Sequence, residues 1–395
     1  MIILGPLFSE KREQEIISAS KKGISNAANN FQWNLIKGIH ANIEEPLIVI
    51  NALPVGTWPK NYKIFHLKDI EWSCKDIVGH EVGCWNIPLV KQFMRMMKAR
   101  AWLKKYPCEL ELLIFTAYLP FLWAVSKLNS AYKVTAVITD IPEFYDMHQV
   151  SVPRKLLRKI HCKFVYYFME RVDRFILLTE QMTVPLHVGN RPYLVMEGMC
   201  GDTVAKPPTA KTQPFSMLYT GRLNRRYGLE LLLRAMKELP DPDIELWLCG
   251  SGEMEKEIHT YAEQDSRIRF FGFLPHEEAV QLQKQATVLI NPRTNQGEYT
   301  KYSFPSKTME YMASGRPVMM FHLDGIPREY DSFLTYIPEE NTASIRDTVK
   351  SLKQLSPSEL DAIGARGREF VLKNKNRNVQ MRRVLDFINK EQSDA

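Results

Sequence analysis

The sequence is poor in cysteine. Six cysteines stand among 395 residues, none in a Cys-x-x-Cys pair and none beside a cluster of histidines. Closely paired cysteines are the usual ligands of structural zinc, and many cysteines in a short chain indicate a disulfide framework. The sequence therefore predicts neither kind of site, and we expect no metal and a reducing, cytoplasmic environment.

Long apolar runs are missing as well. The longest, residues 112–125, is broken by Thr116 and Pro120 and is shorter than the roughly 20 residues that a membrane-spanning helix needs. The first six residues carry neither a basic leader nor a small-residue cleavage site, so we expect no signal peptide. Residues 112–125 instead predict a buried strand that leads into a helix.

The composition is that of a globular protein. Of the 395 residues, 45% are hydrophobic and 25% charged, which at about 150 residues per domain predicts two or three packed units. The formal charge of +7 is compatible with anionic small molecules, nucleic acid or a membrane surface. No recognisable nucleic-acid-reading module accompanies the basic stretches, so we expect no nucleic-acid partner.

Strand-length apolar runs alternate with helical patterns along the whole chain. This alternation predicts an α/β protein made of two tandem, doubly wound, Rossmann-like domains that face an interdomain cleft. The strands expected are 46–50, 112–115, 134–138, 174–179, 215–219, 244–248, 268–271, 286–291 and 318–321. The helices expected are in 142–172, 229–239, 254–263, 276–285 and 307–313, followed by two C-terminal helical segments.

A shift in composition marks the domain boundary. Residues 205–214 are rich in Lys, Pro, Thr and Ala, and their prolines disfavour both helix and strand pairing. We therefore expect an N-terminal domain over 1–204, a linker over 205–214 and a C-terminal domain over 215–375. The last segment, 376–395, is expected to be a helix that could pack back on the N-terminal domain.

The segment 302–318 predicts a short helix that begins at a loop. Ser303 or Ser306 can cap its start, and Gly315 supplies a left-handed stop. Free backbone N–H groups and the positive dipole end at such an N-terminus favour a phosphate oxygen. Glu310, four residues after Ser306, would suit sugar hydroxyls, although it could equally be a solvated surface carboxylate.

The segment 218–229 directly follows the first strand of the second domain. Gly221 allows a tight turn beside a ligand, and the guanidinium groups of Arg222 and Arg226 match the geometry of a diphosphate. The alternative is a solvated basic loop.

Four motifs in a fixed order carry a family resemblance. They are the Gly221-Arg222-Leu223 turn, the Gly250-Ser251-Gly252-Glu253 turn, the segment 271–275, and the block 305–318. Together they resemble the retaining family-4 glycosyltransferases of the GT-B fold, especially those that build bacterial capsule, exopolysaccharide or lipopolysaccharide. The resemblance implies a nucleoside diphosphate sugar held mainly by the C-terminal domain, a saccharide or lipid-linked saccharide acceptor held by the N-terminal one, and no required metal or cofactor. It also implies that Arg222 binds the donor diphosphate and Glu310 the ribose hydroxyls.

The chain departs from the family pattern at two positions. Tyr227 stands where relatives often have Lys, and Arg226 or Arg225 could replace it. Tyr302 stands where the first Glu of a Glu-x7-Glu pattern is expected, and either its hydroxyl or Glu298 could take that place. The residues expected to bind the donor are Gly221, Arg222, Arg226, Gly250, Gly252, Phe273, Tyr302, Ser303, Phe304, Pro305, Ser306, Lys307 and Glu310.

Candidates also occur in the first domain. Asp140 follows a strand where the resemblance places a polar residue over the donor sugar, and with Arg222 and Arg226 it forms the expected catalytic set, although a simple turn aspartate is the alternative. The acceptor side is expected near a segment of small and amide residues: Ser25, Asn26 and Asn29. The Asp241-Pro242-Asp243 sequence, which in another fold would hold a metal, is better interpreted as a turn.

Two basic stretches, 91–105 and 154–168, interleave cations with large apolar residues. Both are amphipathic enough to lie on an anionic leaflet, although each could be an ordinary surface helix. We expect peripheral attachment at the inner face of the membrane.

The function predicted is retaining, metal-independent glycosyl transfer in the synthesis of a cell-surface polysaccharide. The alternatives are a nucleotide-sugar epimerase on the same scaffold and a catalytically decayed nucleotide-sugar-binding protein.

Overall fold

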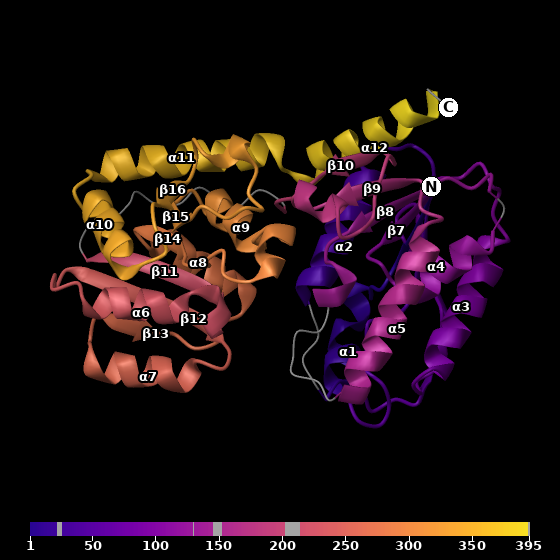
Figure 1. Ribbon diagram of the computed structural model, residues 1–395, viewed down its shortest axis with the longest axis horizontal. Helices are drawn as coiled ribbons and strands as arrows, with labels where there is room; N and C mark the ends of the chain where they lie inside the picture. The colour runs from indigo at the N-terminus through magenta and orange to yellow at the C-terminus, as the bar shows by residue number, and fades with distance from the viewer. Residues whose placement is uncertain (22–25, 129, 145–151, 202–213, 394–395) are drawn as a thin grey trace. The chain divides into compact units, whose positions relative to one another are not determined.

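Two mainly parallel β-sheets form the framework of the chain (Figure 1). The computed structural model describes residues 1–21, 26–128, 130–144, 152–201 and 214–393. The chain divides into unit 1, Met1–Met196 with Arg377–Ala395, and unit 2, Glu197–Asn376. Each unit contains one of the two large sheets.

Unit 1 is built on an eight-stranded sheet of order β10-β9-β8-β7-β1-β2-β5-β4, in which β4 alone is paired antiparallel among the described strands. Its strands are β1 Ile2–Gly5, β2 Leu47–Asn51, β4 Ile70–Cys74, β5 Ile77–Glu81, β7 Leu112–Phe115, β8 Val134–Ile138, β9 Arg174–Leu177 and β10 Tyr193–Val195, with β3 His66–Leu67 and β6 Cys84–Trp85 forming a separate small pair. Its helices are α1 Glu13–Ala19, α2 Asn26–His40, α3 Val90–Leu103, α4 Leu119–Ser126, α5 Val152–Met169 and α12 Arg377–Ser393, with short 3-10 turns η1 Glu10–Arg12, η2 Pro142–Phe144 and η3 Glu180–Thr183.

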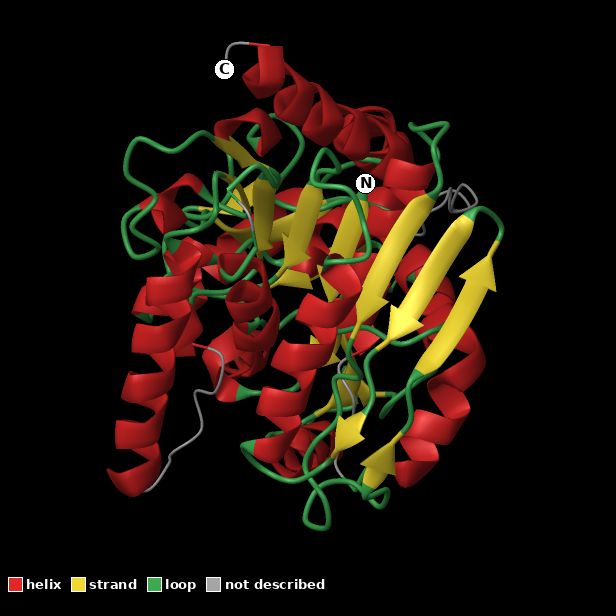
Figure 2. Ribbon diagram, turned by 90° about the vertical axis from the view of Figure 1, so that its right-hand side faces the viewer, coloured by secondary structure: helices red, strands yellow, loops and turns green. Residues whose placement is uncertain are grey.

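The helices of unit 1 cover both faces of its sheet. Helices α3, α4 and α5 contact one another in that order, and α12 contacts α2 (Figure 1). Right-handed crossovers place the first group and α2 on opposite faces, because the strand order reverses between β1 and β7. The yellow strands in Figure 2 accordingly lie between red helices.

Unit 2 has a parallel sheet of order β13-β12-β11-β14-β15-β16. Its strands are β11 Phe215–Arg222, β12 Ile244–Ser251, β13 Ile268–Phe270, β14 Val288–Asn291, β15 Val318–Phe321 and β16 Thr335–Ile337. Its helices are α6 Leu229–Lys237, α7 Glu255–Gln264, α8 His276–Gln285, α9 Ser306–Ser314, α10 Thr342–Lys353 and α11 Pro357–Asn374, with 3-10 turns η4 Arg225–Tyr227, η5 Glu298–Tyr302 and η6 Arg328–Tyr330. In order of sequence the strands read 3-2-1-4-5-6, the arrangement of a Rossmann domain.

The strand order of unit 2 fixes where a ligand is expected. The order reverses between β11 and β14, and open parallel sheets bind ligands beyond the carboxyl ends of the strands at this reversal. An apolar core that includes Leu218, Leu246 and Leu289 holds the strands rigidly beneath that edge.

The division between the units falls before the linker expected from composition. Glu197 forms a buried ion pair with Lys375 (2.6 Å), and the thiol of Cys200 donates to the Val371 carbonyl (3.3 Å). These contacts fasten residues 197–200 to unit 2, so that unit begins at Glu197. Most of the expected linker lies outside the described residues. Helix α12 belongs to unit 1, where Asn42 Nδ2 donates to the Asn378 carbonyl (3.0 Å).

The C-terminal part differs from expectation. After β15 the chain forms a further edge strand, β16, and three helices, α10 to α12, where the sequence pattern predicts two helical segments. Helix α11 starts at a capping box formed by Ser356 and Glu359, which separates it sharply from α10.

Candidate functional site: the carboxyl edge of the unit 2 sheet

The ends of β11 and β14 bring two arginines to the point where the strand order reverses. Strand β11 ends at Gly221 and Arg222, and Arg293 follows β14 after one proline. The two loops touch, because a Cβ added to Gly228 would lie 1.8 Å from the Pro292 carbonyl oxygen. Arg222 and Arg293 therefore belong to one edge of the sheet.

The two expected glycine turns pack against each other. Gly221 and Gly250 are partners in the β11–β12 register and have φ angles of +147° and +143°. A Cβ on Gly250 would lie 1.8 Å from the Gly221 carbonyl oxygen, and one on Gly252 would lie 2.5 Å from the Leu223 carbonyl oxygen. Glycine is required at these positions because the neighbouring backbone leaves no room for a Cβ. The absence of side chains there also lets a ligand approach the edge.

Helix α9 starts at this edge without a serine cap. Pro305 occupies the N-cap position, and no side-chain cap hydrogen bond is made within the described part of the chain, so the prediction that Ser303 or Ser306 caps the helix is wrong. Ser303 is engaged elsewhere, and Ser306 already lies inside the helix. Gly315 ends the helix in the left-handed conformation, as expected. The uncapped first turn keeps donors available for an anion.

Glu310 lies in a polar network on the face of α9 that meets β11. Its Oε1 accepts from Gln283 Nε2 (2.6 Å) and Lys307 Nζ (3.0 Å). The same amide of Gln283 donates to Thr220 Oγ1 (3.1 Å), so helices α8 and α9 are both tied to the end of β11. Lys307 borders the turn, since its Cε would lie 3.8 Å from a Cβ on Gly221.

The charge of Glu310 is stabilised by these contacts. Burial raises the pKa of this carboxyl, but Lys307, the Gln283 hydrogen bond and His276 together outweigh burial and lower the pKa. The neighbouring Tyr311 is fully buried, and its hydroxyl accepts from the Thr220 N–H (2.7 Å). Glu310 is therefore an ionised hydrogen-bond acceptor on a fixed helix, which suits hydroxyl groups of a ligand.

The three arginines in the turn after β11 differ in how strongly other side chains hold them. Arg225 pairs with Glu230 (2.9 Å) and Glu257 (2.5 Å), which leaves it less suited to replace the missing lysine. Arg226 is exposed, with its guanidinium over the ring of Tyr227 (5.1 Å). The side chain of Arg222 is exposed and has no hydrogen bond or ion pair to any described residue.

Arg293 is a site residue that the sequence did not single out. It is 8% exposed, its Nη2 donates to Ser303 Oγ (2.6 Å), and its guanidinium lies over the Tyr299 ring (5.1 Å). One arginine in a polar loop carries no pattern, so only the fold reveals its position beside Arg222.

Of the remaining residues expected to bind the donor, some lie at the surface and others are buried in the core. The Tyr302 hydroxyl donates to Glu298 Oε1 (3.4 Å), so the two candidates for the missing Glu are neighbours. Phe273 is 76% exposed on the loop after β13. Phe304 instead packs in the core against Tyr330, with ring centroids 5.3 Å apart, and Pro305 is buried. The donor-binding role of all of these residues stays a prediction.

The first-domain candidates lie in unit 1. Asp140 is exposed just after β8, and its Oδ2 accepts from Thr139 Oγ1 (3.0 Å). Asn29 lies in α2, and its Oδ1 accepts from the Phe8 N–H (3.0 Å), so part of this amide is used within the fold. Ser25 lies outside the described residues, and Asn26 begins α2. Their catalytic and acceptor roles stay predictions.

Helix α3 presents less cationic surface than its sequence suggests, because two of its cations are buried. Lys91 and Arg95 are buried: Lys91 Nζ donates to the Val55 carbonyl (2.5 Å), and Arg95 Nη2 to the Leu53 carbonyl (2.7 Å). These carbonyls follow the end of β2, and the Leu53 carbonyl also accepts from the Val55 N–H (2.8 Å). Leu89, before the helix, and Phe93 are 83% and 63% exposed instead.

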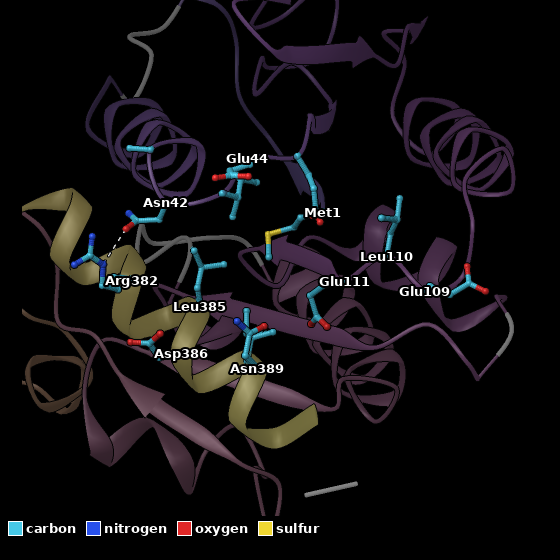
Figure 3. A pocket seen from close by; sticks show the side chains of 14 residues that line it. Met1, Asn42, Glu44, Glu109, Leu110, Glu111, Arg382, Leu385, Asp386 and Asn389 are labelled. Atoms are coloured by element: carbon cyan, nitrogen blue, oxygen red, sulfur yellow. Dashed lines mark hydrogen bonds between the residues drawn. The ribbon is translucent and has the colours of Figure 1, made fainter. Parts of the chain in front are cut away.

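A hollow of about 710 Å³ opens at the edge of the unit 1 sheet where strands β1 and β7 begin (Figure 3). Met1 and Glu111 lie just before strands β1 and β7, so the hollow lies at the amino ends of these strands. Its charged residues are Glu44, Glu45, Glu109, Glu111, Asp386 and Arg382. Five carboxylates against one guanidinium disfavour a nucleotide, and we do not assign the donor to it.

Known proteins resemble the chain in sequence and in fold. Residues 214–354 match the family model of group 1 glycosyl transferases. WcaL of Escherichia coli, named as a colanic acid biosynthesis glycosyltransferase, is 25% identical over 190 residues, and the match covers 46% of this chain and 47% of WcaL. The chain thus spans about half the length of this curated relative.

Solved structures resemble the whole chain. The sucrose-phosphate synthase of Thermosynechococcus elongatus has a TM-score of 0.69 at 15% identity, and the match covers 100% of both chains. Anabaena HepE, solved in complex with UDP, has a TM-score of 0.60 at 14% identity and covers 99% of this chain and 100% of its own. These similarities confirm the expected fold, two Rossmann-like domains of the GT-B type.

No helix among the described residues is both long enough and apolar enough to cross a bilayer.

The Asp241-Pro242-Asp243 segment is a turn before β12, where Asp241 pairs with Lys353 (2.5 Å). That contact agrees with its interpretation as a turn.

Proposed function

We propose that the protein transfers a sugar from a nucleoside diphosphate sugar to a saccharide acceptor. The observation that carries this proposal is the convergence, at the strand-order reversal of unit 2, of exposed Arg222, the uncapped start of α9 and ionised Glu310. Arg222 and the start of α9 offer N–H donors and positive charge to a diphosphate, and Glu310 offers an acceptor to ribose hydroxyls. The family match of residues 214–354 covers this same edge.

We propose further that the transfer retains the anomeric configuration and needs no metal. The bond from the sugar C1 to the diphosphate breaks while the acceptor oxygen bonds to C1 on the same face, and the acceptor proton passes to a diphosphate oxygen. Arg222, Arg226 and the helix start supply the positive charge that stabilises the leaving group. Glu310 is held by Lys307 and Gln283, which suits an acceptor of hydrogen bonds rather than a nucleophile.

The names of similar proteins support the class of acceptor. WcaL is named for the biosynthesis of an exopolysaccharide, colanic acid, and HepE was solved with UDP. We therefore propose synthesis of a cell-surface polysaccharide, in the cytoplasm, on a saccharide or lipid-linked saccharide. Since the relative is named a glycosyltransferase, the epimerase alternative is not favoured.

The test begins with a panel of nucleoside diphosphates and nucleotide sugars. A ligand that binds only the native state raises the melting temperature, so one nucleotide should stabilise the protein. The matching nucleotide sugar is then incubated with and without oligosaccharide acceptors, and the anomeric configuration of the product is read by NMR. Conversion of the donor sugar to its epimer without acceptor, or stabilisation by no nucleotide, would contradict the proposal.

Helix α5 supports peripheral attachment to an anionic membrane. Its inner side buries Cys162, Val165 and Met169, whereas a row of large apolar residues is 43% to 65% exposed on the outer side: Leu156, Leu157, Ile160, Phe164 and Tyr167. Lys155, Lys159 and Lys163 are exposed beside this row. An apolar row flanked by cations is the pattern of a helix that lies in an anionic interface.

Vesicle co-sedimentation tests this attachment at low salt. Binding to vesicles that contain phosphatidylglycerol should exceed binding to pure phosphatidylcholine and should fall in a Leu157→Gln/Phe164→Gln variant. Ile17→Gln on α1, which removes a half-exposed apolar residue from another helix, is the control. Equal binding to both lipids, or no effect of the α5 changes, would overturn the assignment.

A further inference from the structure

Arg293 is a buried cation with too few partners in the described part of the chain. Among the described residues its side chain donates one hydrogen bond, to Ser303 Oγ, and its Nε has no partner, as is also true of the Nε of Arg95 and Arg174. No carboxylate of the described residues lies within ion-pair distance of it. The Tyr299 ring covers its face.

Other buried arginines are better compensated. Arg174 Nη2 meets Glu111 Oε2 at 2.7 Å, and Arg316 pairs with Asp361 (3.3 Å) while donating to the Lys284 carbonyl. Arg95 donates to the Leu53 carbonyl as well as to the Tyr118 hydroxyl. Arg95, like Arg293, has no carboxylate partner among the described residues, but its guanidinium reaches two neutral acceptors where that of Arg293 reaches one, so Arg293 is the least compensated of these four.

The surroundings make this charge costly. Burial lowers the pKa of the Arg293 guanidinium, and nearby Arg226 lowers it further, against the opposing influence of Tyr299 and Tyr227. A buried guanidinium without a counter-charge is expensive, and such groups are normally paired or bind a ligand. The cost is explained if an anion completes the site.

The position of Arg293 places that anion at the edge where the donor is proposed to bind. It follows β14 at the strand-order reversal and lies near Tyr219, whose hydroxyl donates to the Arg222 carbonyl (2.9 Å). The edge thus carries Arg222, Arg226 and Arg293 on adjoining loops. Only Arg222 and Arg226 were expected from sequence.

We propose that Arg293 binds an anionic group of the donor, either the diphosphate or a carboxylate on the sugar. This inference rests on the proposed function, because it assumes a nucleotide sugar at this edge. The planar fork of guanidinium suits either anion through paired N–H donors. Ser303 is then a positioning residue that holds the fork.

Calorimetric titration of an Arg293→Gln variant tests the proposal. The probes are the nucleoside diphosphate that stabilises the wild type, its uncharged nucleoside, and the matching nucleotide-hexose and nucleotide-uronate. Loss of a charge-assisted contact should weaken binding of the anionic probe about ten- to a hundredfold, while binding of the nucleoside stays unchanged. Arg234→Gln, an exposed arginine of α6 paired with Glu230, is the control.

The outcomes distinguish the diphosphate from the sugar carboxylate, and they distinguish a failure of the Arg293 proposal from a failure of the proposed function. Weaker diphosphate binding assigns Arg293 to the diphosphate, and a loss confined to the uronate assigns it to the sugar. Unchanged affinity for both, or an equal loss for the uncharged nucleoside, overturns the inference. A wild type that binds no nucleotide overturns the proposed function instead.

A second variant covers the case in which Arg293→Gln does not fold. Arg293→Lys keeps the charge but loses the fork, so it should weaken binding of the same anionic probe by at least about threefold while the nucleoside binds as in wild type. Full wild-type affinity in this variant would contradict a bidentate contact.

Discussion

Replacing Arg222 by alanine should abolish most of the activity and leave the fold intact. Its side chain is exposed and has no partner among the described residues, so its removal breaks no contact of the described structure. The Tyr219 hydroxyl contacts its main-chain carbonyl, which alanine retains. We therefore expect the free energy of unfolding to change by less than about 0.5 kcal/mol.

The loss of activity follows from the charge on the leaving diphosphate. Removing one donor aimed at developing negative charge lowers kcat about 100- to 1,000-fold in comparable sites, or roughly 3 to 4 kcal/mol. Arg226 and the start of α9 remain, so residual turnover should be measurable.

The assay measures kcat and KM for the donor identified by thermal shift, with urea unfolding on the same preparations. Arg234→Ala removes an exposed, paired arginine from α6 and should change neither quantity. Wild-type turnover in Arg222→Ala would show that this side chain does not act in the reaction. A large drop in stability would show that the side chain contributes to folding, contrary to our reasoning.

Four further results are expected. Gly250→Ala places a Cβ 1.8 Å from the Gly221 carbonyl oxygen at a φ of +143°, so it should destabilise the protein by about 2 to 4 kcal/mol; an unchanged urea midpoint would contradict this crowding. Burial lowers the pKa of Lys91 from 10.5 to about 7, so between these values the unfolded chain binds the proton and the folded one does not. Stability should therefore rise with pH across this range, by up to roughly 5 kcal/mol, and Lys91→Met should flatten the profile. Glu310→Gln should raise the donor KM about tenfold or more with little change in melting temperature, and an unchanged KM would exclude Glu310 from the donor. Treatment with EDTA should leave turnover within about twofold, because cationic side chains take the place of a metal in the proposed chemistry.

Much of the fold was predictable because buried parallel strands are continuous apolar runs. The expected strands 112–115, 134–138 and 318–321 and the helix 276–285 have the bounds found in the structure. Strand β1 was missed, although it is central to its sheet, because no turn residues precede its short apolar run to mark it as a strand. Strands β11 and β12 continue about three residues beyond their apolar runs, since their polar ends stay paired in register.

The candidate site was predictable only in part. Motif spacing identifies Gly221, Arg222 and Glu310, whose backbone and helix contexts are encoded locally. Lys91 is buried because it donates to the Val55 carbonyl, which is distant in sequence. Arg293 lies near Arg222 because the loop after β14 packs against Gly228, which is also distant in sequence. No local pattern contains such contacts, so only the fold shows them.

The most direct test of the donor site is the structure of the protein with the nucleoside diphosphate selected by thermal shift. We predict that the diphosphate lies at the carboxyl ends of β11 and β14, within hydrogen-bonding distance of Arg222 and the first turn of α9, with the ribose at Glu310. A diphosphate bound anywhere else, such as the acidic hollow beside Met1 and Asp386, would contradict it.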